Sequence, residues 1–222
     1  MEMVFLVRTI IFDLDGTLCD TIYDLADATN FALAKMGYPT HSVEKIKSFV
    51  GNGIKNLMIR SMPEEERYEE KIEETKKNFF EYYRFHYADK TVAYEGILEV
   101  LKTLNERGIK LAVCTNKEDT MAKTIVKKLF GDIFSVVIGQ GDKFPLKPNP
   151  ESSYYIMNEL GTTCEDTVFI GDSDVDIKTA NNAGLESIGV SWGFRDVQEL
   201  IDNGCKKIAN NPLDIIKFIE VQ

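Results

Sequence analysis

The amino-acid sequence predicts an α/β fold, in which helices flank a parallel β-sheet and an all-helical segment is inserted early in the chain. From about residue 94 onward, short apolar runs rich in β-branched residues alternate with longer helical patterns. Strands and helices that alternate in this way form βαβ units and hence a parallel sheet. Residues 19–87 differ, because they contain no convincing strand. The length of 222 residues suits one large domain, or one domain with an insertion.

The apolar runs place the strands, and the segments between them place the helices. Strands are expected at residues 10–12, 111–114, 136–138, 168–170 and 187–190, and helices near 97–107, 118–129, 150–160 and 175–183. The run at 10–12 has the same apolar, β-branched pattern as the later strands and should form a central strand of the same sheet. Asn149 is expected to cap the helix near 150–160, with Pro150 at its first position.

Two helical patterns define the insertion. Apolar residues between Ile22 and Met36 recur at helical spacing, and Gly37 follows as a stop. A second stripe, mostly aromatic, runs from Ile72 to Tyr87. We interpret this stripe as the core of a helical bundle, because aromatic residues at helical spacing pack against neighbouring helices.

Bulk composition excludes several classes of protein. The formal net charge is −10 and no Lys/Arg stripe with interleaved aromatic residues occurs, so nucleic acid is not an expected partner. No apolar run approaches the roughly 18 residues of a membrane span. The first eight residues lack the features of a signal peptide, and four cysteines are scattered without paired spacing. We therefore expect a cytoplasmic protein with reduced thiols, without a membrane partner.

Asp13 and Asp15 are the most informative pair of residues. They follow the apolar run at 10–12 and stand two apart, so on an extended segment both side chains point to one face. Gly16 then allows the backbone to turn sharply. Two adjacent carboxylates repel each other and commonly share a cation. A strand followed by an ordinary Asp-Gly turn is the alternative interpretation.

Polar residues follow the other predicted strands as well. Ligands bind outside the carboxyl ends of the strands in open parallel sheets, so these residues should meet at one edge. Thr115 and Asn116 could hold a phosphate oxygen there, and Lys147 is held in a proline-rich loop. After residues 168–170, Asp172 and Asp176 arrive at the same edge.

The acidic residues have distinct expected uses. Asp172 could complete a hard oxygen site with Asp13 and the backbone carbonyl of Asp15, a ligand set that suits Mg²⁺. Asp176, one helical turn further on, could orient a metal-bound water or Lys147. For Asp174 we favour a role in stabilising the helix N-terminus.

These residues resemble the four ordered motifs of the haloacid dehalogenase-like hydrolases. The resemblance extends from residue 9 to about residue 195, and its motifs are Asp13-Leu14-Asp15-Gly16-Thr17, Thr115, Lys147 and Gly171-Asp172-Ser173-Asp174-Val175-Asp176. It implies a Rossmann-like, doubly wound parallel sheet core with an inserted all-α helical-bundle cap. The core would comprise residues 1–17 and 90–222, and the cap, residues 18–89, would determine substrate specificity.

The resemblance also implies catalytic roles. Asp13 would attack the phosphorus of a phosphomonoester and form an aspartyl-phosphate, and Asp15 would protonate the leaving alcohol and later deprotonate the hydrolytic water. Thr115 and Lys147 would hold the transferring phosphoryl group. Asp172 would join Asp13 and Asp15 as a protein ligand of Mg²⁺, the expected cofactor, with support from Asp176.

Cap residues are expected to contact the substrate. Gly51, Asn52 and Gly53 begin a turn whose amides could reach the active site, and Lys55 follows closely. A plain helix–helix turn is the alternative for this segment. The expected partner is a small phosphorylated metabolite, and the expected assembly is a monomer or homodimer.

Further segments are similar to phosphoglycolate phosphatases, namely Val50-Gly51-Asn52-Gly53, Tyr94-Glu95-Gly96, Thr115-Asn116-Lys117 and Val190-Ser191-Trp192-Gly193-Phe194. The predicted function is Mg²⁺-dependent hydrolysis of a small phosphomonoester of the phosphoglycolate type. Alternatives are a phosphomutase resembling β-phosphoglucomutase, an inorganic pyrophosphatase or nucleotidase of the same superfamily, and a non-catalytic member. Residues 115–117 and Gly171 depart from the mutase pattern, and no motif is damaged as a non-catalytic member would require.

Overall fold

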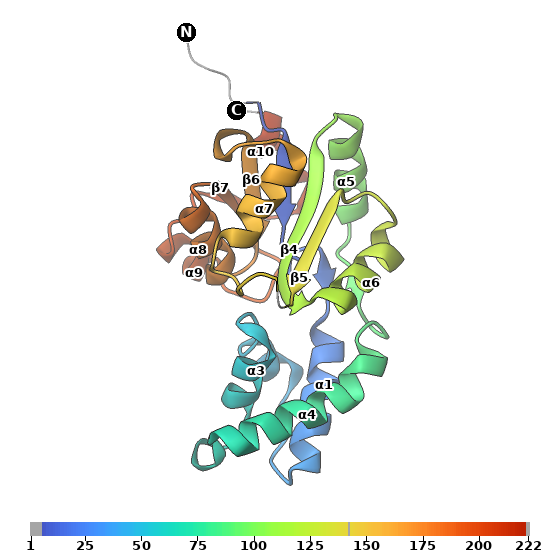
Figure 1. The fold of residues 1–222 in the computed structure, drawn as a ribbon, viewed down its shortest axis with the longest axis vertical. Helices are drawn as coiled ribbons and strands as arrows, with labels where there is room; N and C mark the ends of the chain where they lie inside the picture. The colour runs from blue at the N-terminus through green and yellow to red at the C-terminus, as the bar shows by residue number, and fades with distance from the viewer. Residues whose placement is uncertain (1–5, 142, 221–222) are drawn as a thin grey trace. The chain divides into compact units, whose positions relative to one another are not determined.

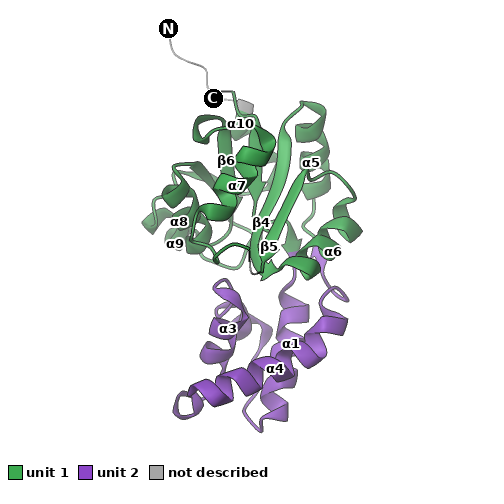
Figure 2. Ribbon diagram, viewed as in Figure 1, with its two compact units in different colours: residues 1–19, 93–222 green, residues 20–92 purple. Residues whose placement is uncertain are grey.

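A computed structural model describes residues 6–141 and 143–220. The chain divides into two compact units (Figure 2), which we describe separately. Unit 1 comprises Met1–Cys19 and Ala93–Gln222, and unit 2 comprises Asp20–Val92. Two short strands, β2 (Cys19–Asp20) and β3 (Val92–Ala93), pair with each other where the chain passes from one unit to the other.

Unit 1 contains a six-stranded sheet in the order β5-β4-β1-β6-β7-β8, with every neighbouring pair parallel. Its strands are β1 (Thr9–Phe12), β4 (Lys110–Glu118), β5 (Val136–Gln140), β6 (Thr167–Gly171), β7 (Glu186–Val190) and β8 (Lys207–Ala209). β1 pairs with β4 on one side and β6 on the other, so the predicted central position of this strand is confirmed.

The direction of the chain across the sheet sorts the helices into two layers. From β1 the chain moves to β4 and β5, and it then returns to β6 and continues outward to β8. Because parallel crossovers are right-handed, this reversal moves the connecting helices from one face of the sheet to the other. One layer contains α5 (Ile97–Glu106) and α6 (Asp119–Phe130), and the other contains α7 (Glu151–Leu160), α8 (Asp174–Ala183) and α9 (Val197–Asp202).

The hydrophobic core of unit 1 reflects these layers. Ile11 packs on one face with Ile156 of α7 and Ala180 of α8, in a cluster that also contains Phe169. On the other face α10 (Pro212–Glu220) packs against α5 and β8 (Figure 1). Ile10, Ile11 and Phe12 are fully buried, as expected for a strand covered on both faces.

Unit 2 is entirely helical apart from its short terminal strands. Its helices are α1 (Ile22–Lys35), α2 (Val43–Lys47), α3 (Gly53–Ser61) and α4 (Glu69–His86), with a 3₁₀ turn at Glu64–Glu66. α1 and α4 pack against each other. Phe79 and Tyr83 of α4 are buried, so their stripe forms bundle core as predicted. The Phe31 and Tyr82 rings stack with centroids 5.0 Å apart.

A buried carboxylate ties the two ends of unit 2 together. Asp24 of α1 is 2% exposed and accepts hydrogen bonds from the backbone N–H groups of Lys90 and Thr91 and from the Thr91 hydroxyl. These bonds compensate for the burial of a charge that would otherwise be costly. The residues that enter and leave the insertion are thereby fixed to each other.

The predicted helix near 150–160 begins one residue later than expected. Pro150 occupies the N-cap, and Glu151 is the first residue of α7. The Asn149 side-chain oxygen still accepts a hydrogen bond from Glu151 N at 2.9 Å, so asparagine satisfies a backbone donor from outside the helix. Among the residues that the structure describes, no helix combines the length and hydrophobicity needed to cross a bilayer.

Candidate active site

Asp13 lies at the carboxyl end of β1, where the order of the strands reverses. β1 stands between β4 and β6, and Asp13 N donates to Ile170 O at 2.9 Å. Ligands of open parallel sheets bind at this kind of position, because the connecting loops diverge to opposite faces and leave a crevice. The fold therefore places Asp13 at the position in unit 1 best suited to bind a ligand.

The turn after Asp13 needs glycine for two reasons. Gly16 has φ +88°, a conformation that residues with a side chain rarely adopt. A Cβ atom there would lie 2.3 Å from Asp172 Oδ2, and one on Gly193 would lie 2.1 Å from the Asp172 Cβ. The two glycines thus allow backbone from two loops to close tightly around the Asp172 side chain.

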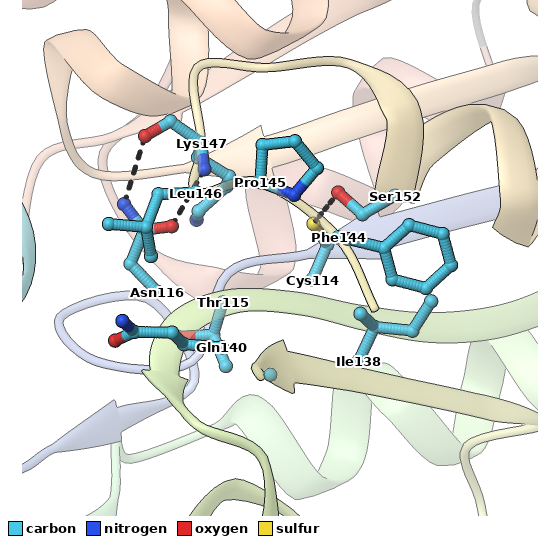
Figure 3. A pocket seen from close by; sticks show the side chains of 11 residues that line it. Cys114, Thr115, Asn116, Ile138, Gln140, Phe144, Pro145, Leu146, Lys147 and Ser152 are labelled. Carbon is cyan, nitrogen blue, oxygen red and sulfur yellow. Dashed lines mark hydrogen bonds between the residues drawn. The ribbon is translucent and has the colours of Figure 1, made fainter. Parts of the chain in front are cut away.

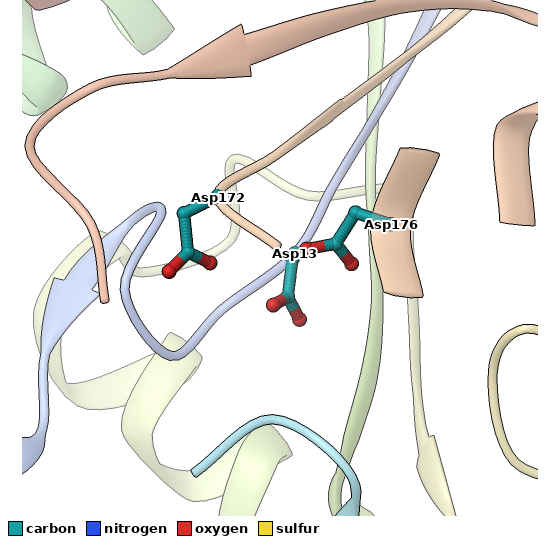
Figure 4. Close-up of side chains that lie close together, drawn as sticks. All are labelled: Asp13, Asp172 and Asp176. Carbon is teal, nitrogen blue, oxygen red and sulfur yellow. The ribbon is translucent and has the colours of Figure 1, made fainter. Parts of the chain in front are cut away.

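Three buried carboxylates converge at this site (Figure 4). Asp13, Asp172 and Asp176 each contribute an oxygen to a group whose members all lie within 4.8 Å of one another. Asp172 accepts hydrogen bonds from Phe194 N at 2.7 Å and from the Thr17 hydroxyl at 3.2 Å. These donors fix the orientation of the Asp172 side chain.

Lys147 is the cation that bridges two of these carboxylates. Its ammonium Nζ lies 2.8 Å from Asp13 Oδ1 and 2.6 Å from Asp176 Oδ1, and the residue is 6% exposed. Asn116 holds the loop that carries this lysine, since its side chain accepts from Lys147 N at 2.8 Å and donates to Lys147 O at 3.1 Å. Lys147 is therefore fixed at both its backbone and its ammonium group.

Burial and mutual repulsion perturb the ionisation of the cluster. Burial, then repulsion from Asp176, raises the pKa of Asp13 to about 7, although Lys147 opposes the rise. Burial and the neighbouring carboxylates of Asp176 and Asp13 raise the pKa of Asp172 to about 8. For Lys147, burial lowers the pKa, but Asp13 and Asp176 outweigh it and hold the pKa above its ordinary value.

The cluster has the composition of a divalent-cation site. Three carboxylates face one lysine, so the fully ionised group carries an excess of negative charge that protein atoms alone do not balance. Carboxylate oxygens are hard ligands, and Mg²⁺ is bound in proteins by a few carboxylates together with water and substrate phosphate. The residues present therefore fit a magnesium ion.

Asp176 and Asp174 have different environments although both belong to the first turn of α8. The Asp176 carboxylate accepts from Ser173 N at 3.0 Å and from the Ser173 hydroxyl at 2.6 Å, in a capping box. Asp174 forms an ion pair with Lys178 one turn further on. Only Asp176 belongs to the buried carboxylate group.

Thr115 lines a small pocket beside Lys147 (Figure 3). The pocket encloses about 10 Å³, which is room for about one water molecule. Asn116, Cys114 and Ser152 also line it, and the Cys114 sulfur lies 3.1 Å from the Ser152 hydroxyl. The Thr115 side-chain oxygen accepts a hydrogen bond from the backbone N–H of Lys117 at 3.2 Å.

Lys117 is a site residue to which the strand-end argument assigned no role. Its ammonium Nζ lies 3.1 Å from Asp15 Oδ1, and its side chain is only 3% exposed. The spacing from Thr115 could have indicated this position, because residues two apart on an extended segment share a face. The backbone N–H of Phe194 had no comparable signal, since any residue type except proline supplies one.

The cap residues that were predicted to contact the substrate lie in unit 2, at the start of α3. Gly51 and Gly53 have φ values of +118° and +78°, and Asn52 is the N-cap residue. Lys55 is exposed and forms an ion pair with Glu69, with 2.5 Å between Nζ and Oε1. A role for these four residues in substrate binding stays a prediction.

Comparisons with known proteins agree with the fold and with the kind of site. A family model described as haloacid dehalogenase-like hydrolase matches residues 10–190. Phosphoglycolate phosphatase of Psychrobacter arcticus is 37% identical over 202 residues, covering 87% of each chain. The corresponding enzyme of Neisseria meningitidis is 37% identical over 196 residues, covering 86% of this chain and 83% of its own.

Solved structures give the same result. A crystal structure from Lactobacillus delbrueckii subsp. bulgaricus, provisionally named a phosphoglycolate phosphatase, superposes with a TM-score of 0.92 at 31% identity. The match covers 96% of this chain and 98% of that one. Hydrolase SP0104 of Streptococcus pneumoniae, at 22% identity and a TM-score of 0.87, supports the fold alone.

Proposed function

Since this chain belongs to the haloacid dehalogenase-like hydrolases and is a phosphoric monoester hydrolase, we propose that it is a Mg²⁺-dependent phosphatase that acts through an aspartyl-phosphate. One observation carries the proposal. The Asp13 carboxylate, at the end of the central strand, lies 2.8 Å from Lys147 and within 4.8 Å of Asp172 and Asp176. A nucleophile, a fixed cation and potential metal ligands are thus assembled around one point.

In the first step an Asp13 carboxylate oxygen attacks the phosphorus. A bond forms between this oxygen and phosphorus while the bond from phosphorus to the leaving oxygen breaks. Asp15 donates a proton to the departing alcohol. Lys147 and Thr115 bind the equatorial oxygens of the transferring group, which reduces the repulsion between an anionic nucleophile and an anionic substrate.

In the second step water hydrolyses the aspartyl-phosphate. Asp15, now ionised, takes a proton from the water, whose oxygen attacks phosphorus. The bond to Asp13 breaks, inorganic phosphate leaves, and the carboxylate is regenerated. Lys117 holds the Asp15 carboxylate near this position, as its 3.1 Å ion pair suggests.

Asp13, Asp172 and the backbone carbonyl of Asp15 would hold the magnesium ion. When bound, Mg²⁺ supplies positive charge that offsets the negative charge of the phosphoryl group. The raised pKa values of Asp13 and Asp172 indicate why the metal matters, because both groups must lose their protons to act as ligands. Asp176 keeps Lys147 in place through its 2.6 Å contact.

The substrate that we propose is a small phosphomonoester of the phosphoglycolate type. The named relatives are phosphoglycolate phosphatases and most of their length is covered. Unit 2 would act as the cap, with Gly51, Asn52, Gly53 and Lys55 contributing to substrate choice. Cytoplasmic location and a monomeric or homodimeric state remain predictions.

A phosphate-release screen tests this proposal. Purified protein is assayed with 2-phosphoglycolate, sugar phosphates, nucleotides and pyrophosphate, each with MgCl₂ or EDTA. We expect release that requires Mg²⁺, favours 2-phosphoglycolate and falls by at least about a thousandfold in Asp13→Asn, because no nucleophile remains. Activity that survives in Asp13→Asn would refute the mechanism, whereas preference for another substrate would refute only the phosphoglycolate assignment.

Asp15→Asn separates the proposed acid from the nucleophile. With an alkyl phosphate the variant should form no phosphoenzyme, since the poor leaving group needs a proton. With p-nitrophenyl phosphate, whose leaving group needs none, a single burst of p-nitrophenol should precede stalled turnover. A normal burst with the alkyl phosphate would show that Asp15 is not the acid. Asp174→Asn serves as the matched control, because its carboxylate pairs with Lys178 outside the buried group.

A further inference from the structure

Unit 2 contains a surface pocket that the proposed reaction does not use. Its volume is about 400 Å³, within the range of small-ligand sites. All of its lining residues belong to unit 2, from Pro39 to Arg67. Arg60 lines it near the end of α3, roughly 10 Å along that helix from Gly53, so the pocket is separate from the turn predicted to contact the substrate.

The pocket is cationic although the chain as a whole is acidic. Three permanent cations, from Lys45, Arg60 and Arg67, line it together with His41, whereas Glu64 supplies the one carboxylate of the lining. The formal net charge of the chain is −10. A concave surface of the opposite sign attracts anions locally, because charge in a cleft with low-dielectric walls is focused rather than screened.

Two of these cations, Lys45 and Arg60, lack the carboxylate partners found elsewhere in unit 2. Lys35 and Lys55, for example, each lie 2.5 Å from a glutamate oxygen. In the part of the chain that the structure describes, no carboxylate lies within 4.0 Å of Lys45 or Arg60, and Arg67 approaches Glu64 only to 3.8 Å. Much of the positive charge in the pocket is therefore not compensated by protein.

The arginines are held in place before any ligand arrives. Arg60 Nη1 donates to Phe49 O at 2.9 Å, and Arg67 donates through Nε and Nη2 to Met62 O at 3.0 and 2.9 Å. A guanidinium group has five N–H donors, so each arginine retains further donors. Side chains that are already ordered lose less entropy when they bind a ligand.

An aromatic side chain completes the wall. The Lys45 ammonium lies 5.1 Å from the centre of the Phe49 ring. The His41 and Phe49 rings pack edge-to-face, with 5.6 Å between their centroids. His41 Nε2 lies 2.8 Å from Ser61 O, which fixes this imidazole. The pocket thus combines ordered, positively charged hydrogen-bond donors with an apolar surface that can pack against the carbon skeleton of a ligand.

We propose that this pocket binds a small organic anion that carries two or more carboxylate or phosphate groups. Planar guanidinium forks from Arg60 and Arg67 match the geometry of such groups, and Lys45 adds a third charge. A single monovalent anion would leave most of this charge unpaired. The volume admits a compact metabolite and is larger than one inorganic anion requires.

Methionine methyl NMR on the full chain locates the binding. Met62 lines the pocket, whereas Met121 and Met157 lie in helices of unit 1 and serve as references. Citrate and inorganic phosphate are titrated separately in EDTA and 0.15 M NaCl. We expect citrate to shift Met62 saturably with a Kd below about 1 mM, at least tenfold tighter than phosphate. An unresponsive Met62, or equal affinity for phosphate, would overturn the proposal.

Matched double variants test the cations. Lys45→Gln/Arg60→Gln should weaken citrate binding at least tenfold, or by about 1.4 kcal/mol. Lys77→Gln/Arg84→Gln removes the same charge from exposed positions on α4 and should leave affinity unchanged. Equal losses in both variants would indicate general electrostatics and refute a built site.

Arg60→Gln also removes the hydrogen bond to Phe49 O, so folding is checked by thermal unfolding. Lys45→Gln alone, matched to Lys77→Gln, avoids that bond. We expect at least a threefold loss of citrate affinity in Lys45→Gln and none in Lys77→Gln. Unchanged affinity in Lys45→Gln would count against the pocket.

Discussion

Replacing Asp172 by asparagine should stabilise the metal-free protein at alkaline pH. The substitution removes one of three carboxylates that are buried together while preserving side-chain size. The asparagine carbonyl can accept the hydrogen bond from Phe194 N, and its amide can donate to the Thr17 hydroxyl, which is also an acceptor. The variant therefore removes charge and keeps both hydrogen bonds of the side chain, with the direction of the one to Thr17 reversed.

The raised pKa of Asp172 sets the scale of the effect. Its pKa rises from an ordinary value of 3.8 to about 8 in the folded protein, because of burial and then repulsion from Asp176 and Asp13. One pKa unit corresponds to about 1.4 kcal/mol, so ionised Asp172 costs at most about 5 kcal/mol at pH 8. Burying a neutral amide also costs free energy, and we expect a net gain of about 2 kcal/mol.

The sign of the pH dependence follows from proton binding. A carboxyl group with a raised pKa binds more protons in the folded state than in the unfolded state, so stability falls as pH rises. For Asp172 the loss begins above pH 3.8 and is complete above about pH 8. The advantage of the variant should therefore be present at pH 8 and absent at pH 5.

Thermal unfolding in EDTA at these two pH values measures the effect. A gain of about 2 kcal/mol raises the Tm of a chain of this size by about 4–8 °C. Asp174→Asn, whose carboxylate forms a partly exposed ion pair, should change stability by less than about 0.5 kcal/mol. A metal-free Asp172→Asn protein no more stable than wild type at pH 8, or equally stabilised at pH 5, would refute the reasoning.

Addition of Mg²⁺ should reverse the order of stability. A ligand at a hundredfold its Kd stabilises the folded state by about 2.7 kcal/mol. Wild type should therefore gain about 5–10 °C in Tm with saturating MgCl₂. The variant should gain much less, since it lacks one proposed ligand.

Three further substitutions test other parts of the structure. Lys117→Gln should reduce kcat by about tenfold to a hundredfold with little change in Tm, because Asp15 loses its 3.1 Å partner; steady-state kinetics and thermal unfolding measure both. Gly16→Ala should lower the free energy of unfolding, measured in urea, by about 2 kcal/mol or more. The alanine would have to adopt φ +88°, and its Cβ would lie 2.3 Å from Asp172 Oδ2. Asp24→Asn should lower the free energy of unfolding by about 2–3 kcal/mol in the same assay, because buried backbone N–H groups lose a charged acceptor. Wild-type values in any of the three would contradict the role given to that residue.

Strongly apolar strands were predictable from sequence, and short polar ones were not. The runs at 10–12, 111–114 and 168–170 all form strands, because residues buried on both faces leave a continuous apolar pattern. β8 contains only Lys207–Ala209 and lies at the edge of the sheet, so it needs no such run. Its pairing with β7 arises from the tertiary structure.

The acidic side chains of the site could also be predicted from the sequence, because parallel strands present their carboxyl ends at one edge of the sheet. Asp13, Asp172 and Asp176 meet as that topology requires. The backbone donor of Phe194 and the close approach of Gly193 depend on the path of a distant loop. Such contacts are determined by shape, and a residue type alone does not indicate them.

The central position of β1 has a consequence for the order in which the protein folds. During synthesis β1 emerges first, but it pairs only with β4 and β6, whose residues are far along the chain. The contacts Asp15–Lys117 and Arg8–Asp166 span 102 and 158 residues. Long-range pairings of this kind form slowly, because much chain entropy is lost before any contact compensates for it.

Unit 2, by contrast, is one continuous segment, Asp20–Val92, and its closing contact between Asp24 and Thr91 spans 67 residues, so it can fold while later strands are still being synthesised. β6, which carries Asp172 and Asp176 toward the site, must dock before the cluster exists. The repelling carboxylates are therefore brought together only when most of the sheet is already in place to hold them.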